Sequence, residues 1–353
     1  MKRTLIYFVF ALALVFTGCQ RENLPEDIGL KVNEDGKVTL TFSASALPLA
    51  TISTKAGIDD AVNRIDLLVF TGKKNGVGGQ FIEKVKATEV TYDPVSKAGT
   101  FKVVVSHNAR IFHLFVNYDD IDNINERDIL LKYENDIVPY LHVHGVDKLV
   151  YWGRIDLSTE GLPESGTIGS IPLYRNLAMV TVENNDADFD VLGFSLCNYA
   201  TTSSVSPFDR TATGGNPFVW DISKPSIPES SSHTDSESAP NTDPKYTADY
   251  QNPAGDQLYV ILRAKMREPD QPWGAEQFYK VLLSDKEWET YPVGRNVNFI
   301  IKISAMKAHV GVDTYEQAKT AAPINDLTGV DVIPFSPQID DMDNNSLSVL
   351  PQN

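Results

Sequence analysis

The chain has 353 residues, of which 42% are hydrophobic, and a formal net charge of −16 at pH 7. This length allows one large domain or two of ordinary size, and the hydrophobic share is sufficient to build their cores. A surface this acidic repels phosphate backbones, which excludes nucleic acid as an expected partner. Only two cysteines are present, Cys19 and Cys197.

The N-terminus has the organisation of an export signal. A basic pair at 2–3 precedes an unbroken apolar run over 5–16, and small residues then lead to Cys19. The run is shorter than the about 20 apolar residues that a spanning helix needs. Residues 1–18 resemble a bacterial lipoprotein signal peptide, which implies that Cys19 becomes lipidated (palmitate) and anchors the chain to a membrane. An ordinary secretory signal is the alternative. Cys197 lies in an apolar run typical of a buried, inert thiol.

The strongest strand pattern follows a short linker. Residues 19–36 are polar and acidic and predict a flexible tether. Over Lys37–Leu47, apolar and polar residues then alternate strictly, which predicts a strand with one buried face. The apolar members of this strand are Val38, Leu40, Phe42, Ala44 and Ala46. A loop from 48 to 60 comes next.

Two blocks of short strands make up the rest of the chain. The first block has strand patterns at 64–70, 80–90, 100–105, 111–118 and 148–155 and one helix expected over 124–133. The second has strand patterns at 167–174, 178–183, 191–198, 258–263, 277–283 and 297–304 and a short helix over 315–321.

Turn residues around 158–166 separate these blocks. The sequence therefore predicts an all-β chain of two β-sandwich domains in series, over 37–163 and 164–353, with minor short helices. Residues 200–253 are rich in Ser, Pro, Thr and Asp and predict a long surface loop in the second domain, partly disordered.

No catalytic motif is present, so we expect a structural or binding protein that is not an enzyme and needs no cofactor. His142 and His144 lie on one side of a strand but lack a third ligand at a recognisable spacing, so no metal site is expected. The acidic groups at 119–122 and 340–344 lack the glycine and distal glutamate of a calcium loop. Four scattered tryptophans could pack cores or form a sugar platform; they are Trp152, Trp220, Trp273 and Trp288.

Three segments carry a family resemblance. They are the strand at 37–47 with Ser53-Thr54-Lys55-Ala56 and 64–70; residues 171–182 with 194–198 and 205–208; and residues 291–303 with Gly311 and 315–318. Together with the lipoprotein signal, they resemble the fimbrillin family, the fimbrial subunits of Bacteroidales. The resemblance implies two transthyretin-like β-sandwich domains and secretion as a lipoprotein precursor. It also implies that a protease removes the N-terminus with the first strand, and that the C-terminal strand of a neighbouring subunit fills the groove.

Applied to this chain, the resemblance implies roles for particular residues. The displaced strand is the one that carries Val38, Leu40, Phe42, Ala44 and Ala46. The best-known members are cut after arginine, whereas the matching loop here offers Lys55-Ala56, and Arg64 already begins the next strand. The candidate donor residues are Val330, Val332, Ile333 and Phe335, or else Leu347, Val349 and Leu350. The alternative is that Lys37–Leu47 is a permanent first strand.

The expected function is that of a structural subunit of a surface fimbria, assembled by donor-strand exchange and supporting adhesion. Its expected partners are other copies or related fimbrial subunits, a processing protease, and the outer membrane through the N-terminal lipid. Two alternatives stay open: an uncleaved basal anchor of a fimbria, and a cell-surface lipoprotein that binds glycans.

Overall fold

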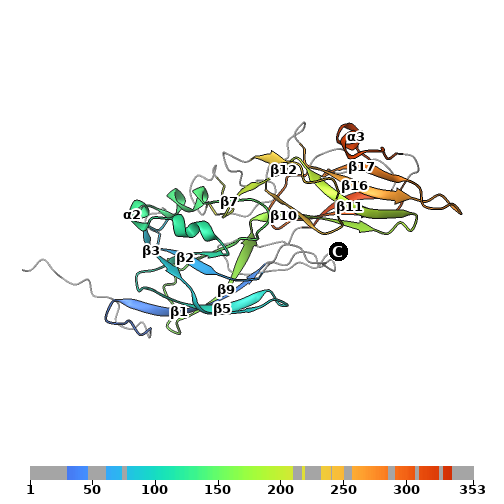
Figure 1. The fold of residues 1–353 in the computed structure, drawn as a ribbon. Helices are drawn as coiled ribbons and strands as arrows, with labels where there is room; N and C mark the ends of the chain where they lie inside the picture. The colour runs from blue at the N-terminus through green and yellow to red at the C-terminus, as the bar shows by residue number, and fades with distance from the viewer. Residues whose placement is uncertain are drawn as a thin grey trace, which may run out of the picture.

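The computed structural model describes residues 30–46, 61–73, 78–209, 217–218, 232–239, 241–249, 257–284, 291–306, 310–325 and 329–335. Strands dominate this part of the chain and its helices are short, so the predicted all-β class is confirmed (Figure 1). Within the same residues, no helix combines the length and the apolar character needed to span a membrane. The predicted signal peptide over 1–18, Cys19, Lys55, Ala56 and the alternative donor residues Leu347, Val349 and Leu350 lie outside the described residues.

Eight strands build the first half of the molecule, and they are β1 (Lys37–Ala46), β2 (Ile65–Phe70), β3 (Phe81–Lys86), β4 (Thr88–Asp93), β5 (Ala98–Ser106), β6 (Ile111–Val116), β8 (Tyr151–Asp156) and β9 (Thr167–Arg175). Their hydrogen-bonded order is β3-β2-β6-β8-β9-β1-β5-β4. β9 joins two layers, because its first part pairs with β1 and its last two residues pair with β8. The rings of Phe42 on β1 and Phe112 on β6 meet edge to face, 5.2 Å apart, so the layers enclose a common core.

The outer face of β2, β6 and β8 is buried as well. It packs beneath η1 (Asp119–Asn123), α2 (Glu126–Ile129), η2 (Glu134–Asp136), η3 (Val138–Tyr140) and β7 (His142–His144). Burial on both faces explains why β2 and β6 are largely apolar instead of alternating, with Asp66 and His113 as their only polar residues. Of the helix predicted over 124–133, the structure contains only the single turn α2. Its N-cap is Asn125. It ends at the C-cap Leu130, whose ψ of 130° is not helical, and Leu131 follows with a left-handed φ of 64°.

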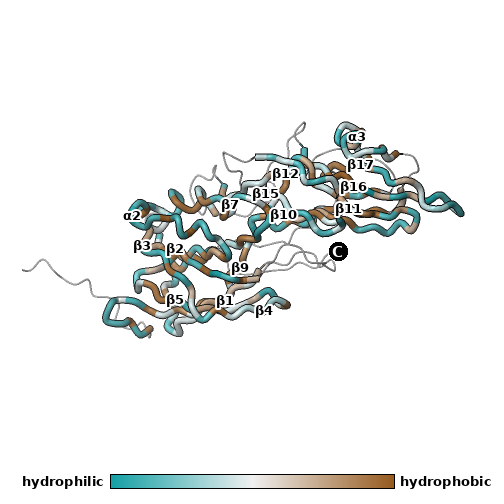
Figure 2. The backbone as a smooth tube through the Cα atoms, in the orientation of Figure 1, coloured by the Kyte–Doolittle hydropathy of each residue, from teal (hydrophilic) through white to brown (hydrophobic). Residues whose placement is uncertain are grey.

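The second half contains two further sheets. One has the order β15-β10-β18-β19 and the other β11-β16-β17, and their facing side chains form the second part of the core. Figure 2 shows apolar positions recurring along the strands of both halves, whereas the end of the β16–β17 hairpin is hydrophilic. The elements are β10 (Leu177–Asn184), β11 (Phe189–Cys197), β12 (Tyr199–Ala200), β13 (Thr202–Ser204), β14 (His233–Thr234), β15 (Lys245–Ala248), β16 (Tyr259–Met266), β17 (Glu276–Leu282), β18 (Asn298–Ile303), α3 (Tyr315–Thr320) and β19 (Val330–Phe335).

The strand partners change at Asn176, between β9 and β10. β9 pairs with β1 and β8 of the first half, whereas β10 pairs with β15 and β18 of the second. The change of partners thus comes one strand later than the domain boundary expected at 163/164. Independent folding of the two halves stays a prediction.

The two halves also interlock through the 200–253 stretch. β13 pairs with β7 of the first half, and Val205 and Phe218 are buried in the core beneath the short helices. Part of the predicted surface loop is therefore interior, because its apolar residues complete the outer core of the first half.

Candidate functional site

β1 is a middle strand of the first half and has a partner on each side. It pairs antiparallel with β5 over its whole length and parallel with β9 from Thr41 onward. The Thr41 N–H donates to Gly166 O at 2.8 Å on the β9 side, and the Ala46 N–H donates to Lys97 O at 2.9 Å on the β5 side. Without β1, the main-chain groups of two neighbouring strands would lack their partners.

The side chains of β1 alternate as the sequence predicts. Val38, Leu40, Phe42 and Ala44 are buried, and Ala46 is half-buried at the rim of the same core. Burial of a large apolar side chain stabilises the fold by about 1.5–3 kcal/mol, so this strand contributes several kcal/mol. β1 is therefore both a central strand of the sheet and an apolar strip of the core.

Phe42 is the aromatic residue of this strip. It lies directly opposite Phe101 of β5, and their rings stack with planes 3° apart and centroids 5.3 Å apart. The edge-to-face contact with Phe112 comes from the opposite layer. The sequence indicates Phe42 by its alternation, but no local signal identifies Phe101 and Phe112 as its neighbours, because they lie about 60 and 70 residues further along the chain.

β19, the candidate donor, is hydrogen-bonded in this structure to β18 of its own chain, antiparallel, as the last strand of its sheet. Val330 and Val332 face the core, whereas Ile333 is 43% exposed. The candidate donor residues Val330, Val332, Ile333 and Phe335 therefore do not share one face, since successive residues of a strand point to opposite sides. Their role as donor residues stays a prediction. Phe335 lies opposite Asn298 in the register, and its side chain is outside the described residues.

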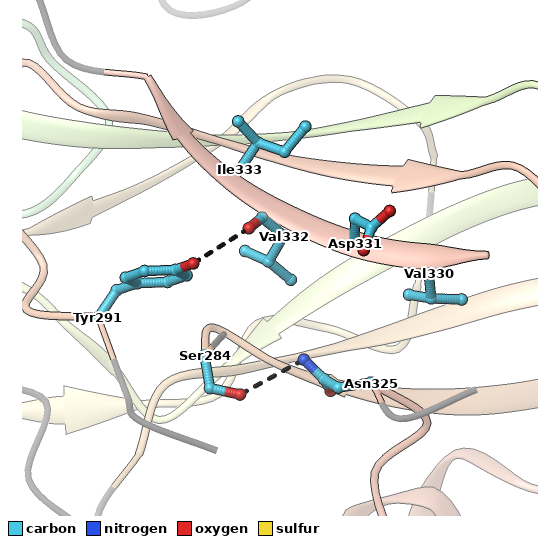
Figure 3. Close-up of a pocket in the computed structure, with 7 residues that line it drawn as sticks. All are labelled: Ser284, Tyr291, Asn325, Val330, Asp331, Val332 and Ile333. Atoms are coloured by element: carbon cyan, nitrogen blue, oxygen red, sulfur yellow. Dashed lines mark hydrogen bonds between the residues drawn. The ribbon is translucent and has the colours of Figure 1, made fainter. Parts of the chain in front are cut away.

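A cavity of about 220 Å³ runs beside β19 (Figure 3). It is lined by Ser284, Tyr291, Asn325 and residues 330–333. The Ser304 N–H donates to Gly329 O at 2.6 Å, which sets a register in which the main-chain groups of Val332 point away from β18. On that outer side, the Tyr291 hydroxyl donates to Val332 O at a long 3.5 Å. The outer edge of β19 thus has this long hydrogen bond, whereas β1 is hydrogen-bonded to a strand on each side.

A buried polar cluster lies elsewhere, in the outer core of the first half. Glu134 accepts from the guanidinium of Arg154 at 2.9 and 3.1 Å and lies 2.8 Å from Nε2 of His113. Arg154 also donates to Asp156, which pairs with Lys73 at 2.9 Å. All three members of the central group are buried, and their contacts are made to each other and to neighbouring strands. The arrangement is suited to fixing the short helices onto β6 and β8.

The histidines His142 and His144 lie on β7, where they pair with β13. Nδ1 of His144 is 3.3 Å from the Thr202 hydroxyl. Across the described ranges, no group of three or more His, Cys, Asp or Glu residues is arranged to hold a metal ion.

The acidic group at 119–122 forms ion pairs on the surface. Asp122 pairs with Arg64 and Asp119 with Lys148. The second acidic group, at 340–344, lies outside the described residues. Cys197 is buried with its Sγ 3.3 Å from the Tyr315 hydroxyl, and burial raises the pKa of its thiol to about 11.

The tryptophans divide between core and surface. Trp152 is fully buried in the outer core of the first half, which makes it unavailable to a sugar. Trp273 is 42% exposed near the end of the β16–β17 hairpin, with the Arg267 guanidinium 5.0 Å from its ring centre. Trp220 and Trp288 lie outside the described residues.

No protein-family model and no curated protein sequence match this chain. Several solved structures resemble it at low identity. A proposed cell-adhesion protein from Parabacteroides distasonis is 10% identical, with 86% of this chain and 98% of that one covered and a TM-score of 0.47. The tip fimbrial protein Mfa3 from Porphyromonas gingivalis, truncated at its C-terminus, is 13% identical, with 85% and 98% covered and a TM-score of 0.48. A proposed cell-adhesion protein from Bacteroides eggerthii is 9% identical, with 84% and 95% covered and a TM-score of 0.44. Each of these TM-scores lies below 0.5.

Proposed function

We propose that this chain is a structural subunit of a surface fimbria, assembled by donor-strand exchange after proteolysis and supporting adhesion. In this proposal, Cys19 carries the lipid that holds the precursor at the cell outer membrane. A protease then cuts between Lys55 and Ala56, and β1 leaves. The partners are other copies or related fimbrial subunits, and a strand from one of them takes the place of β1.

The position of β1 is the observation that carries this proposal. It is the first described strand and a middle strand of the sheet, and β2 begins only at Ile65. A single cut in the intervening stretch, where Lys55 and Ala56 lie, separates β1 from the rest of the chain without breaking another described element. Such a cut leaves β5 and β9 as the two walls of an apolar groove, which another extended segment can fill by strand addition.

The surroundings of Arg64 support Lys55 as the cleavage position. The Arg64 guanidinium pairs with Asp66 and Asp122, and its side chain is only 20% exposed. Because the residue is held immediately before β2, a protease would have to unfold that strand to reach the bond. Lys55 is the other basic residue in the sequence between β1 and β2.

A glycan-binding surface lipoprotein is the second candidate, and one observation favours it. Trp273 is a half-exposed aromatic ring at a hairpin end, and the Arg267 guanidinium lies against it. That guanidinium in turn donates to Asp188 at 3.0 and 2.7 Å. An exposed ring held in this way can stack on a sugar. Glycan binding by the monomer, with no polymer on the cell surface, would favour this candidate.

N-terminal sequencing with intact mass tests the proposal, on protein from sheared surface material and from membranes. We expect surface material that starts at Ala56 and carries no lipid. Lys55→Gln should abolish that product, whereas the control Lys31→Gln, an exposed lysine before β1, should not. Surface polymer that retains residues 37–46 would overturn the proposal. Acylated Cys19 in membranes only, with nothing in the sheared fraction, would instead indicate a basal anchor.

A further inference from the structure

The space that Phe42 fills is an aromatic site built by both layers of the first half. Phe101 of β5 stacks against one face of the Phe42 ring, and Phe112 of β6 meets it edge to face. Ile168 of β9, itself buried, is the register partner on the other side. We call the space enclosed by Phe101, Phe112 and Ile168 the Phe42 socket.

The socket differs from the other positions along the groove. The places of Val38 and Leu40 hold aliphatic side chains, and those of Ala44 and Ala46 hold methyl groups. Only the Phe42 position sets a ring between two other rings, where offset or edge contacts add to the burial of apolar area. A replacement strand without a large ring would leave a cavity in the centre of the core.

The C-terminal segment offers one residue that meets this requirement. From Leu327 to Asn353, Phe335 is the only aromatic residue. The alternative donor residues Leu347, Val349 and Leu350 supply aliphatic side chains only. Ile333, two positions before Phe335, is 43% exposed on its own sheet and would occupy the neighbouring site on the same face of the incoming strand.

We infer that Phe335 of a second copy of this chain takes the place of Phe42, and that the Phe42 socket selects the donor strand. The inference rests on the proposed function, since β1 must leave before the socket can be filled. In the donated strand, the face that carries Ile333 and Phe335 then points into the groove that β1 leaves. Val330 and Val332, which face the core of their own chain, then lie on the outer face of the donated strand.

A peptide exchange measurement on the full-length chain, cleaved between β1 and β2, tests this inference. The bound β1 fragment carries a fluorescent label, and its release by added peptides is followed to equilibrium. The peptides are residues 37–47, 329–338 and 344–353 of this chain. The 329–338 peptide is also made with Phe335→Ala and, as the matched control from the other face, with Val332→Ala.

We expect peptide 329–338 to displace β1 and Phe335→Ala to weaken it at least about 100-fold, which corresponds to about 2.8 kcal/mol. Val332→Ala should change the affinity less than about threefold. In the acceptor, Phe101→Leu should weaken binding of the unmodified peptide but hardly that of the Phe335→Ala peptide, because the two changes remove one shared contact.

Three results would overturn the inference while leaving strand exchange intact. They are equal binding of the unmodified and Phe335→Ala peptides, a larger loss from Val332→Ala than from Phe335→Ala, and stronger displacement by peptide 344–353 than by 329–338. Failure of every peptide, including residues 37–47, to replace β1 would instead overturn the proposed function itself, and this inference with it.

Discussion

Trp152 donates its indole N–H to Nδ1 of His113 at 3.2 Å, and this bond fixes the tautomer of a fully buried histidine. Because Nδ1 accepts, the proton lies on Nε2, which donates to Glu134 at 2.8 Å. The imidazole is thus neutral with both nitrogens satisfied. It joins β6 and β8 to the short helix η2, which makes the outer core of the first half sensitive to pH.

Stability should fall in mild acid because of His113. Burial lowers the pKa of this histidine below its ordinary 6.5, so the unfolded chain binds the proton more tightly than the folded one. The free energy of unfolding should therefore decrease as the pH drops below about 6.5. Urea unfolding between pH 7.5 and 5 should show a shallower pH dependence for His113→Gln than for wild type. The exposed His233→Gln should behave as wild type, and parallel profiles for all three proteins would contradict this account.

Glu134→Gln should destabilise the protein by about 3 kcal/mol at pH 7, because it removes the charge opposite the buried Arg154. Burial alone would raise the pKa of Glu134, but its contacts with His113 and Arg154 outweigh burial and hold the pKa at about 2. The contribution of the carboxylate is therefore present above its ordinary pKa of 4.5 and is lost as the pH falls toward 2. Denaturant unfolding at pH 7 measures the loss.

The control for this prediction is the exposed ion pair between Glu89 and Lys102. Glu89→Gln should change the free energy of unfolding by less than about 1 kcal/mol, since exposed pairs are screened by solvent. Equal effects of Glu134→Gln and Glu89→Gln would mean that the buried cluster does not hold the outer core together.

Phe42→Ala should lower the free energy of unfolding by about 3–5 kcal/mol, because it leaves a ring-sized cavity against Phe101 and Phe112. Thr39→Ala on the exposed face of the same strand should change it by less than about 0.5 kcal/mol. Chemical denaturation of the uncleaved chain gives both values. A loss below 1 kcal/mol for Phe42→Ala would show that β1 is not part of the core in solution.

Asn176→Ala should destabilise the junction between the halves by about 1–3 kcal/mol. The Asn176 side chain accepts from the Val150 N–H at 3.0 Å and donates to the Ser203 hydroxyl at 3.1 Å. The substitution therefore leaves the buried Val150 N–H and Ser203 hydroxyl without these hydrogen-bond partners. Denaturant unfolding followed by tryptophan fluorescence checks the value, with the exposed Asn108→Ala as the control. Indistinguishable midpoints for the two variants would argue against this link.

Several features could be predicted from local sequence because they depend on neighbouring residues. The alternation over Lys37–Leu47 identified β1 and its buried face, since side-chain direction in a strand has a period of two residues. The short helix expected over 315–321 corresponds to α3. Its capping box between Thr314 and Gln317 is local, and its six residues fall within the expected 315–321.

Other features depended on contacts between distant residues. A helix is expected over 124–133, but the non-helical backbone of Leu130 and the left-handed backbone of Leu131 limit α2 to one turn. Val330, Val332 and Ile333 are candidate donor residues, and the pairing of β19 with β18 shows that they lie on two faces of the strand. Hydrophobicity alone does not tell which side of an edge strand faces the core.

The sequence by itself determined the all-β class and the buried strip of β1, because both follow from patterns within a few residues. Only the tertiary structure decided that β1 lies between β5 and β9, and that Phe42 stacks on Phe101 and meets Phe112. Strand order and ring contacts around β1 join residues that are about 50 to more than 120 positions apart. They are set by which sheets close over a common core, and no local pattern carries that information.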